Sequence, residues 1–200
     1  FCCDYRPMRS PVFFDLEYTV WEGSMANRRL RPGEVREVVQ IGAVKVASDT
    51  LETVAAFEVL VRPRINTQLS SYLENLTGIT NAALVARGVD FRAAYDRFVE
   101  FVGGGPIVSF GRDDIVLIQN LALYGIHDAP PLPAHHNIAP WLNRNGVATK
   151  GLHACDVAKA CGSDFASREH DALEDARSLV AGSRALMARG AVSLFADDRP

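Results

Sequence analysis

The stretch Val12-Phe13-Phe14-Asp15-Leu16-Glu17-Tyr18-Thr19 is an apolar run that ends with two carboxylates one residue apart. Its aromatic and branched residues predict a buried strand over residues 12–18. Successive strand side chains point to opposite faces, so Asp15 and Glu17 leave the same face, roughly 6.5 Å apart at a rise of about 3.3 Å per residue. Two carboxylates this close repel each other unless a metal cation or a positive side chain lies between them. The pair therefore indicates half of a metal site.

The segments around this strand predict an α/β fold, a mixed sheet flanked by helices. Residues 37–46 and 51–61 are rich in β-branched and apolar residues, and with the first strand they predict an antiparallel meander of three strands. A further short, buried strand is expected at residues 107–110, directly after a glycine-rich breaker. The meander of three strands is followed by helices around at least one more strand. This order favours a sheet that also has parallel pairing.

Helical spacing and capping residues predict the helices. Asp90, for example, is a typical N-cap for a helix whose apolar residues recur at helical spacing. The helices are expected at residues 80–87, 91–102, after Gly111, 139–142, 152–160 and 173–189. The remaining segments, at residues 21–36, 69–80 and 127–137, are expected to be loops or short irregular structure.

The length and composition indicate one folded domain. A chain of 200 residues is the usual size of a single domain, so residues 1–200 are expected to form one, with residues 1–10 as a loose N-terminal segment. Its 48% hydrophobic and 22% charged content is that of a globular protein. No apolar run approaches the roughly 18 residues of a membrane span, so a membrane partner is not expected.

The N-terminal residues and the cysteines indicate a cytoplasmic protein. The first residues lack the basic and then apolar order of a signal peptide. Cys2, Cys3, Cys155 and Cys161 match neither a disulfide framework nor the spacing of zinc or redox sites, so reduced thiols are expected.

The charge of the chain limits how it binds nucleic acid. A net charge of −3 argues against a strongly steered nucleic-acid binder, although a metal or a local basic surface can still hold phosphate. Arg28, Arg29, Arg31 and Arg36 stand in one polar segment. They can either grip phosphates or form an ordinary solvated loop face, and the sequence leaves both interpretations open.

A second acidic cluster stands at residues 169–176, where a helix is expected to begin. Asp171, followed three residues later by Glu174, is a capping-box signature. In that frame His170 is N′ and Asp175 is N4, two positions that lie together in the hydrophobic-staple geometry. The sequence therefore predicts an imidazole beside a carboxylate whose ionised form the helix dipole stabilises.

The two clusters together indicate phosphodiester hydrolysis. The set comprises Asp15, Glu17, an acid at Asp113 or Asp114, His170 and Asp175. Two divalent cations held by such acids stabilise the attacking and leaving oxygens of a phosphoryl displacement, while a nearby histidine deprotonates water. Hard oxygen ligands favour Mg²⁺ or Mn²⁺ over zinc.

Five motifs in order resemble the DEDDh 3′-to-5′ exonucleases of the proofreading superfamily, which have an RNase H-like fold. These motifs are Phe14-Asp15-Leu16-Glu17-Tyr18-Thr19, Glu37-Val38-Val39-Gln40-Ile41-Gly42-Ala43-Val44, Leu76-Thr77-Gly78-Ile79-Thr80, Ser109-Phe110-Gly111-Arg112-Asp113-Asp114, and His170 with Asp175. Trp21-Glu22-Gly23 and the Gly-x-x-Asp form of the fourth motif resemble the branch of histone-mRNA and RNA-interference exonucleases and sporulation-inhibitor-like proteins.

The resemblance implies a role for each site residue. Asp15 would bridge two cations, Glu17 and Asp175 would complete the shell of the first, and Asp114 would hold the second. The family has a Trp where Asp113 stands, so Asp113 is a departure from the pattern. His170 would be the general base.

The resemblance also implies which residues meet the substrate and what that substrate is. Leu16 and residues 76–80, which include Thr77, Gly78 and Ile79, would meet the terminal nucleotide. Trp21 can stack on a base or pack in the core equally well. The expected partner is the 3′ end of single-stranded RNA or DNA, with RNA slightly favoured, and the expected products are nucleoside 5′-monophosphates.

Three alternatives compete with this interpretation. One is a DNA-directed proofreading or repair exonuclease. Another is a catalytically silent nucleic-acid-binding module, against which the presence of all five catalytic residues argues. The last is a separate zinc site at His135, His136 and His153, whose spacing matches no common zinc motif.

Overall fold

A five-stranded mixed sheet forms the centre of the molecule, in the order β3-β2-β1-β4-β5. The computed structural model describes residues 9–24 and 32–195. β1 pairs antiparallel with β2, and β2 with β3, whereas β1–β4 and β4–β5 are parallel. The strands are β1 (Val12–Tyr18), β2 (Val38–Val46), β3 (Thr53–Leu60), β4 (Ile107–Ser109) and β5 (His135–Asn137). The expected α/β class, with a three-strand meander and added parallel strands, is confirmed.

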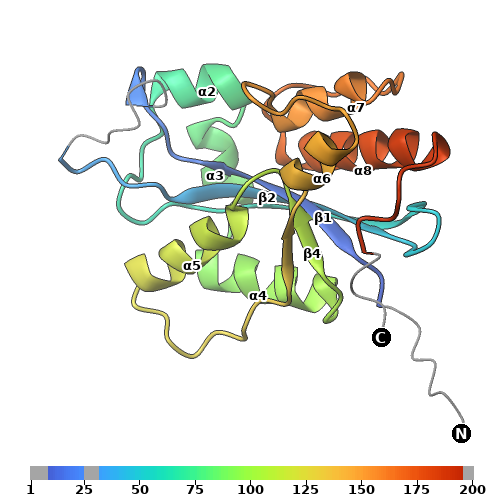
Figure 1. Cartoon of the computed structure of the whole chain (residues 1–200). Helices are drawn as coiled ribbons and strands as arrows, with labels where there is room; N and C mark the ends of the chain where they lie inside the picture. The colour runs from blue at the N-terminus through green and yellow to red at the C-terminus, as the bar shows by residue number, and fades with distance from the viewer. Residues whose placement is uncertain (1–8, 25–31, 196–200) are drawn as a thin grey trace, which may run out of the picture.

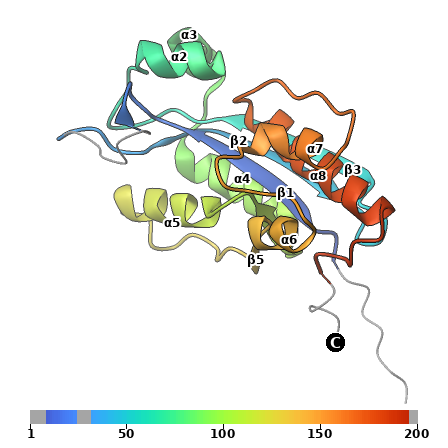
Figure 2. The same cartoon turned by 45° about the horizontal axis from the view of Figure 1, so that its top comes forward.

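Helices cover both faces of this sheet (Figure 1, Figure 2). α7 and α8 lie on one face and α4 and α5 on the other. The helices are α2 (Ser71–Thr77), α3 (Asn81–Arg87), α4 (Phe91–Val102), α5 (Asp113–Leu123), α6 (Ala139–Arg144), α7 (Val157–Ala160) and α8 (Ala172–Ala188), with a 3₁₀ turn η1 (Ala154–Asp156) before α7.

The alternation along β1 separates two cores. Phe13 packs into the cluster that contains α8 residues such as Leu179, and Phe14 packs into the opposite cluster with Phe98 of α4. Because strand side chains alternate, Asp15 and Glu17 lie on the α8 face together with Phe13. The strand pattern therefore decides which helix can supply further acids.

Two segments differ from the sequence prediction. Residues 69–80 were expected to be irregular but contain α2, which Ser70 caps by accepting from the Leu73 N–H, and which ends at Gly78 with φ 72°. Residues 127–137 were expected to be a loop, yet their last three residues form β5 beside β4. Both elements are short, so tertiary packing decides whether they form.

Part of the arginine-rich segment lies outside the described residues. This applies to Arg28, Arg29 and Arg31, and to most of the N-terminal segment 1–10. Arg36 is described and lies over the Tyr18 ring, 5.6 Å from its centroid. No helix of the described chain is both long and apolar enough to cross a membrane.

Candidate active site

β1 presents the first two acids at the end of the strand, between β2 and β4. Asp15 stands opposite Gly42 of β2, and Glu17 stands opposite Gln40. The Glu17 side chain is largely buried, with 9% of the residue exposed. Both carboxylates are thus fixed by a central strand whose register is set on its two sides.

Gly42 allows α8 to begin directly above these acids. A Cβ at this position would lie 2.1 Å from the Leu173 backbone nitrogen and 2.2 Å from the Ala172 carbonyl carbon. A side chain of any size would therefore push the first turn of α8 off the sheet. With glycine, that turn lies beside Asp15 and brings Asp175 to the same place.

The predicted start of α8 is confirmed. Asp171 is the N-cap, and its side chain accepts from the N–H groups of Leu173 at 3.1 Å and Glu174 at 3.4 Å. Asp175 follows in the first turn and is 5% exposed. The helix N-terminus favours the ionised form of such an acid, but burial and the neighbouring carboxylates outweigh this effect and raise the pKa of Asp175 to about 7.

The acids and the histidine line one pocket with a volume of ≈ 190 Å³. Its lining comes from the end of β1, from the residue after β4, from α2, from the first turns of α5 and α8, and from the segments before α7 and α8. The lining residues are Asp15, Leu16, Glu17, Tyr18, Val20, Leu76, Phe110, Asp113, Leu152, His153, Ala154, His170 and Asp175. The structure thus brings together residues that are far apart in the sequence.

Asp113, and not Asp114, is among the residues that line this pocket, whereas the resemblance places the family's acid on Asp114. Asp114 is held by Arg112 through two bonds of 2.9 Å each, and its Oδ1 lies 3.3 Å from Nδ1 of His135. Burial opposes the effect, but the bonds from Arg112 and the nearby His135 hold the pKa of Asp114 below its ordinary value. Because these partners occupy Asp114, the preceding carboxylate is the one that faces the other acids.

The four pocket carboxylates have raised pKa values. Burial is the main cause in every case, followed for Asp15 by the charges of Asp113, Asp175 and Glu17, which raise its pKa well above the ordinary range. Burial and the charge of Asp175 raise the pKa of Glu17 to about 8. The pKa of Asp113 rises to about 7, as does that of Asp175. Without a cation, the pocket therefore disfavours its own full ionisation.

The carboxylate oxygens of the pocket are suitable ligands for a divalent cation. Oxygens of Asp15, Glu17 and Asp175 lie within 4.8 Å of one another. Among the described residues, the buried Oδ2 of Asp113 and Oδ1 of Asp175 have no hydrogen-bond partner. Buried carboxylate oxygens are normally paired, and hard oxygen ligands are the ones that Mg²⁺ and Mn²⁺ prefer. The pocket can thus bind a cation, whose positive charge no side chain of its lining supplies.

The residues expected to meet substrate are only partly at the pocket. Leu16 lines it, and so does Leu76, which directly precedes Thr77. Thr77, Gly78 and Ile79 are not among its lining residues. The Thr77 hydroxyl instead donates to the Leu73 carbonyl and accepts from the Ile79 N–H, which shapes the end of α2.

Trp21 also lies outside the pocket lining, although its neighbour Val20 belongs to it. The Trp21 backbone bonds with the Ser24 hydroxyl, at 3.1 Å for the N–H and 2.7 Å for the carbonyl. Sequence reasoning did not single out Phe110 or Leu152, which also line the pocket. Both are ordinary apolar residues after a strand or in a loop, so no local signal distinguishes them.

The three histidines considered for a zinc site have separate surroundings. His135 contacts Asp114 and Ser109, whereas the ring of His136 meets that of Phe195 edge-on with centroids 5.7 Å apart. His153 lies at the pocket, its ring centroid 6.3 Å from that of His170. His153 is therefore a pocket residue that the motif comparison did not include.

Comparisons with known proteins show to which family the chain belongs. A family model described as exonuclease, RNase_T, matches residues 12–181. The human protein named 3′-5′ exoribonuclease 1 is 41% identical over 66 residues, which are 33% of this chain and 17% of that protein. The chain thus matches only about a sixth of this relative's length.

Solved structures share the fold. The nuclease domain of 3′hExo, described as a DEDDh family member bound to rAMP, superposes with a TM-score of 0.77 at 23% identity, covering 94% of this chain and 95% of that one. A 3′-exonuclease described as recognising the 3′ end of a histone mRNA stem-loop has a TM-score of 0.77 at 23% identity, covering 93% and 84% of the two chains. With the family model spanning all five motifs, the resemblance is confirmed, and the chain belongs to the exonuclease family RNase_T.

Proposed function

We propose that the protein is a 3′-to-5′ exonuclease that hydrolyses the terminal phosphodiester bond of single-stranded nucleic acid, RNA in preference to DNA, and releases nucleoside 5′-monophosphates. The observation that carries the proposal is the pocket lined by Asp15, Glu17, Asp113 and Asp175 together with His170. Family membership supports the reaction class. The names of the human exoribonuclease and the histone-mRNA exonuclease support RNA as the polymer.

Two divalent cations, Mg²⁺ or Mn²⁺, belong to this proposal. Asp15, Glu17 and Asp175 would hold one, and Asp113 with Asp15 would hold the other. When bound, the cations would supply Lewis-acid activation of water and neutralise phosphate charge. The proximity of the three carboxylates and the unpartnered oxygens of Asp113 and Asp175 support this assignment.

His170 would act as the general base. A ring nitrogen would accept a proton from water as the water oxygen bonds to phosphorus and the bond from phosphorus to the 3′ oxygen breaks. The 3′ oxygen would take up a proton from solvent, which leaves the shortened strand with a 3′ hydroxyl. Burial, and then the charge of His153, lower the pKa of His170 below its ordinary value. A lowered pKa keeps the imidazole neutral, and therefore able to accept a proton, over more of the pH range.

The terminal nucleoside would pack against the apolar residues of the pocket lining. Leu16, Val20 and Leu76 belong to this lining, as do the acids and His170. Such an arrangement would place a phosphate near the acids while the base and sugar remove apolar surface from water.

Matched RNA and DNA oligonucleotides labelled at the 5′ or 3′ end test the proposal. With Mg²⁺ or Mn²⁺, we expect the 3′ label to appear first as a mononucleotide, the 5′-labelled strand to shorten stepwise, and RNA to be cut faster. EDTA should abolish both reactions. Internal cleavage would refute the exonuclease, binding without hydrolysis would support the silent module, and faster loss of DNA would support the DNA-directed alternative.

A further inference from the structure

His170 has a backbone conformation that is uncommon for residues other than glycine. Its φ is 57°, in the left-handed region, and within the described chain only one other non-glycine residue, Leu51, has a positive φ. A non-glycine residue persists in this conformation when its surroundings hold it there. Contacts on both sides of His170 must therefore hold it in this conformation.

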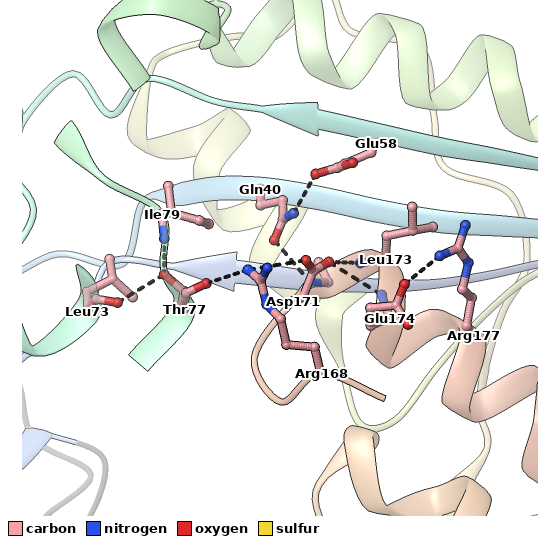
Figure 3. A network of polar contacts seen from close by, with 11 residues as sticks. Gln40, Glu58, Leu73, Thr77, Ile79, Arg168, Asp171, Leu173, Glu174 and Arg177 are labelled. Atoms are coloured by element: carbon pink, nitrogen blue, oxygen red, sulfur yellow. Dashed lines mark hydrogen bonds and ion pairs between the residues drawn. The ribbon is translucent and has the colours of Figure 1, made fainter. Parts of the chain in front are cut away.

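Gln40 holds the chain two residues after His170. Its side chain is buried, with 3% of the residue exposed. The Ala172 N–H, one of the first amides of α8 that lack a partner within the helix, donates to Oε1 of Gln40 at 3.1 Å. Nε2 of Gln40 in turn donates to Oε1 of Glu58 at 2.9 Å (Figure 3). A backbone N–H can only donate and a carboxylate oxygen can only accept, so these two partners fix the orientation of the amide.

Arg168 holds the chain two residues before His170. Its Nη2 donates to the Thr77 carbonyl at 3.2 Å and lies 3.5 Å from Oδ2 of Asp171, as Figure 3 shows. This contact joins the segment before α8 to the end of α2, across 91 positions of sequence. The backbone of His170 is thus held between one anchor on α2 and one on β2.

We propose that Gln40, through Ala172, and Arg168, through Thr77 and Asp171, are positioning residues that keep His170 directed at the pocket. Neither side chain is among the described residues that line the pocket, so the proposed role is exerted through His170. The inference rests on the proposed role of His170 as general base. It adds two residues outside the acidic set whose loss should impair the chemical step and leave cation binding intact.

The first test uses Gln40→Leu and Arg168→Ala, with Gln119→Leu as the matched control. Gln119 is an exposed residue of α5. In each test variant, kcat should fall by about tenfold or more, because small displacements of a reacting group are costly. KM for the oligonucleotide and the affinity for Mn²⁺, measured by electron paramagnetic resonance, should stay near wild type, and Arg168→Lys should recover part of the rate. A parallel loss of Mn²⁺ affinity would overturn the inference.

A double-mutant cycle then separates positioning from a general structural effect. If Gln40 acts through His170, Gln40→Leu should cause no further loss of kcat in a His170→Ala background. A full additional loss in that background would refute the inference alone. A wild-type rate for His170→Ala would instead reject the base role, and the inference with it.

Exchange of the amide of Gln40 with the carboxylate of Glu58 provides a further test. Gln40→Glu alone places two carboxylates beside each other, and their repulsion should lower kcat. Adding Glu58→Gln restores a donor opposite an acceptor while residue 40 still accepts from the Ala172 N–H, so kcat should rise again. A paired variant that is no better than Gln40→Glu would contradict the hydrogen-bonded arrangement as the cause.

Discussion

Glu37 and the pocket acids are all carboxylates removed from water, yet their surroundings differ. Glu37 is fully buried and accepts hydrogen bonds from the N–H groups of Arg64, Ile65 and Asn66, from the Asn66 side chain, and from the Tyr124 hydroxyl. Burial alone would raise its pKa, but the bonds from Tyr124 and the backbone lower the pKa overall. Glu37 is thus a fully hydrogen-bonded structural carboxylate that connects the residue before β2 with the segment after β3.

The pocket has the opposite character. Burial and neighbouring carboxylates raise the pKa of Glu17 to about 8, and oxygens of Asp113 and Asp175 lack partners among the described residues. Burial is common to both regions, so burial does not distinguish them. The two regions differ in the hydrogen-bond donors that surround the carboxylates. Buried carboxylate oxygens without donors indicate a place that a cation can occupy.

The largest expected contrast is between Asp15→Asn and Glu37→Gln. Asp15→Asn removes a proposed ligand and should lower the rate on single-stranded RNA by about 10³-fold or more. It also removes like-charge repulsion, so Tm of the metal-free protein at pH 8 should rise. Glu37→Gln should keep most of the rate but lower Tm, because the amide cannot accept all of the bonds. Initial rates and calorimetry check both, and changes in Tm of the same sign would contradict the comparison.

The adjacent acids Asp113 and Asp114 provide the next contrast. Asp113→Asn should reduce the rate by about 10²-fold, and Asp114→Asn by less than about tenfold. The reason is that Asp113 lines the pocket whereas Asp114 is occupied by Arg112 and His135. Rates at saturating Mg²⁺ and the Mn²⁺ affinity of each variant measure the difference. A larger loss for Asp114→Asn would restore the register that the family pattern implies.

The pocket acids and Glu37 should change the free energy of unfolding with pH in opposite directions. Folding raises the pKa of Glu17 to about 8 and those of Asp113 and Asp175 to about 7, so the folded state binds more protons than the unfolded state up to these values. This contribution is present at low pH and is lost as pH rises through about 7 to 8. Folding lowers the pKa of Glu37 below its unfolded value of 4.5. Ionised Glu37 therefore stabilises the protein above about pH 4.5, and this contribution is lost in acid.

Calorimetry in EDTA from pH 5 to 8 should therefore show Tm falling by several degrees, since one pKa unit corresponds to about 1.4 kcal/mol. Saturating Mg²⁺ at pH 8 should reverse the loss, by about 2.7 kcal/mol at 100 times its Kd. The Asp15→Asn variant should show a flatter pH profile. A Tm that rises steadily from pH 5 to 8 without metal would refute the electrostatic account of the pocket.

The smallest expected effect is that of Tyr124→Phe. This variant removes the 2.6 Å hydrogen bond to Glu37 and should lower stability by about 1–2 kcal/mol, with the nuclease rate unchanged. Tyr72→Phe, at another half-buried tyrosine, serves as the control in chemical denaturation. Equal stability of the two variants would show that the other donors to Glu37 suffice.

Patterns within single segments predicted most of the fold. Strand alternation placed Asp15 and Glu17 on one face, and the capping residues placed the start of α8 so that His170 and Asp175 could meet. β5 could not be predicted, because its residues, His135 to Asn137, have no strong strand preference and pair only because β4 lies beside them. α2 had an N-cap and a glycine at its end, but seven residues form a stable helix only when packed, as Leu73 is.

The sequence by itself determined the chemistry available to this protein: four acids and a histidine, in an order typical of one exonuclease family. Only the tertiary structure decided which of two neighbouring aspartates joins the pocket. Both stand in the first turn of α5, where local energetics do not distinguish them. The choice depends on His135, which arrives from β5 and with Arg112 engages Asp114, so that Asp113 is left to face Asp15. The opening strand predicted two of the pocket acids, and contacts from distant segments bring Asp113 and Asp175 to them.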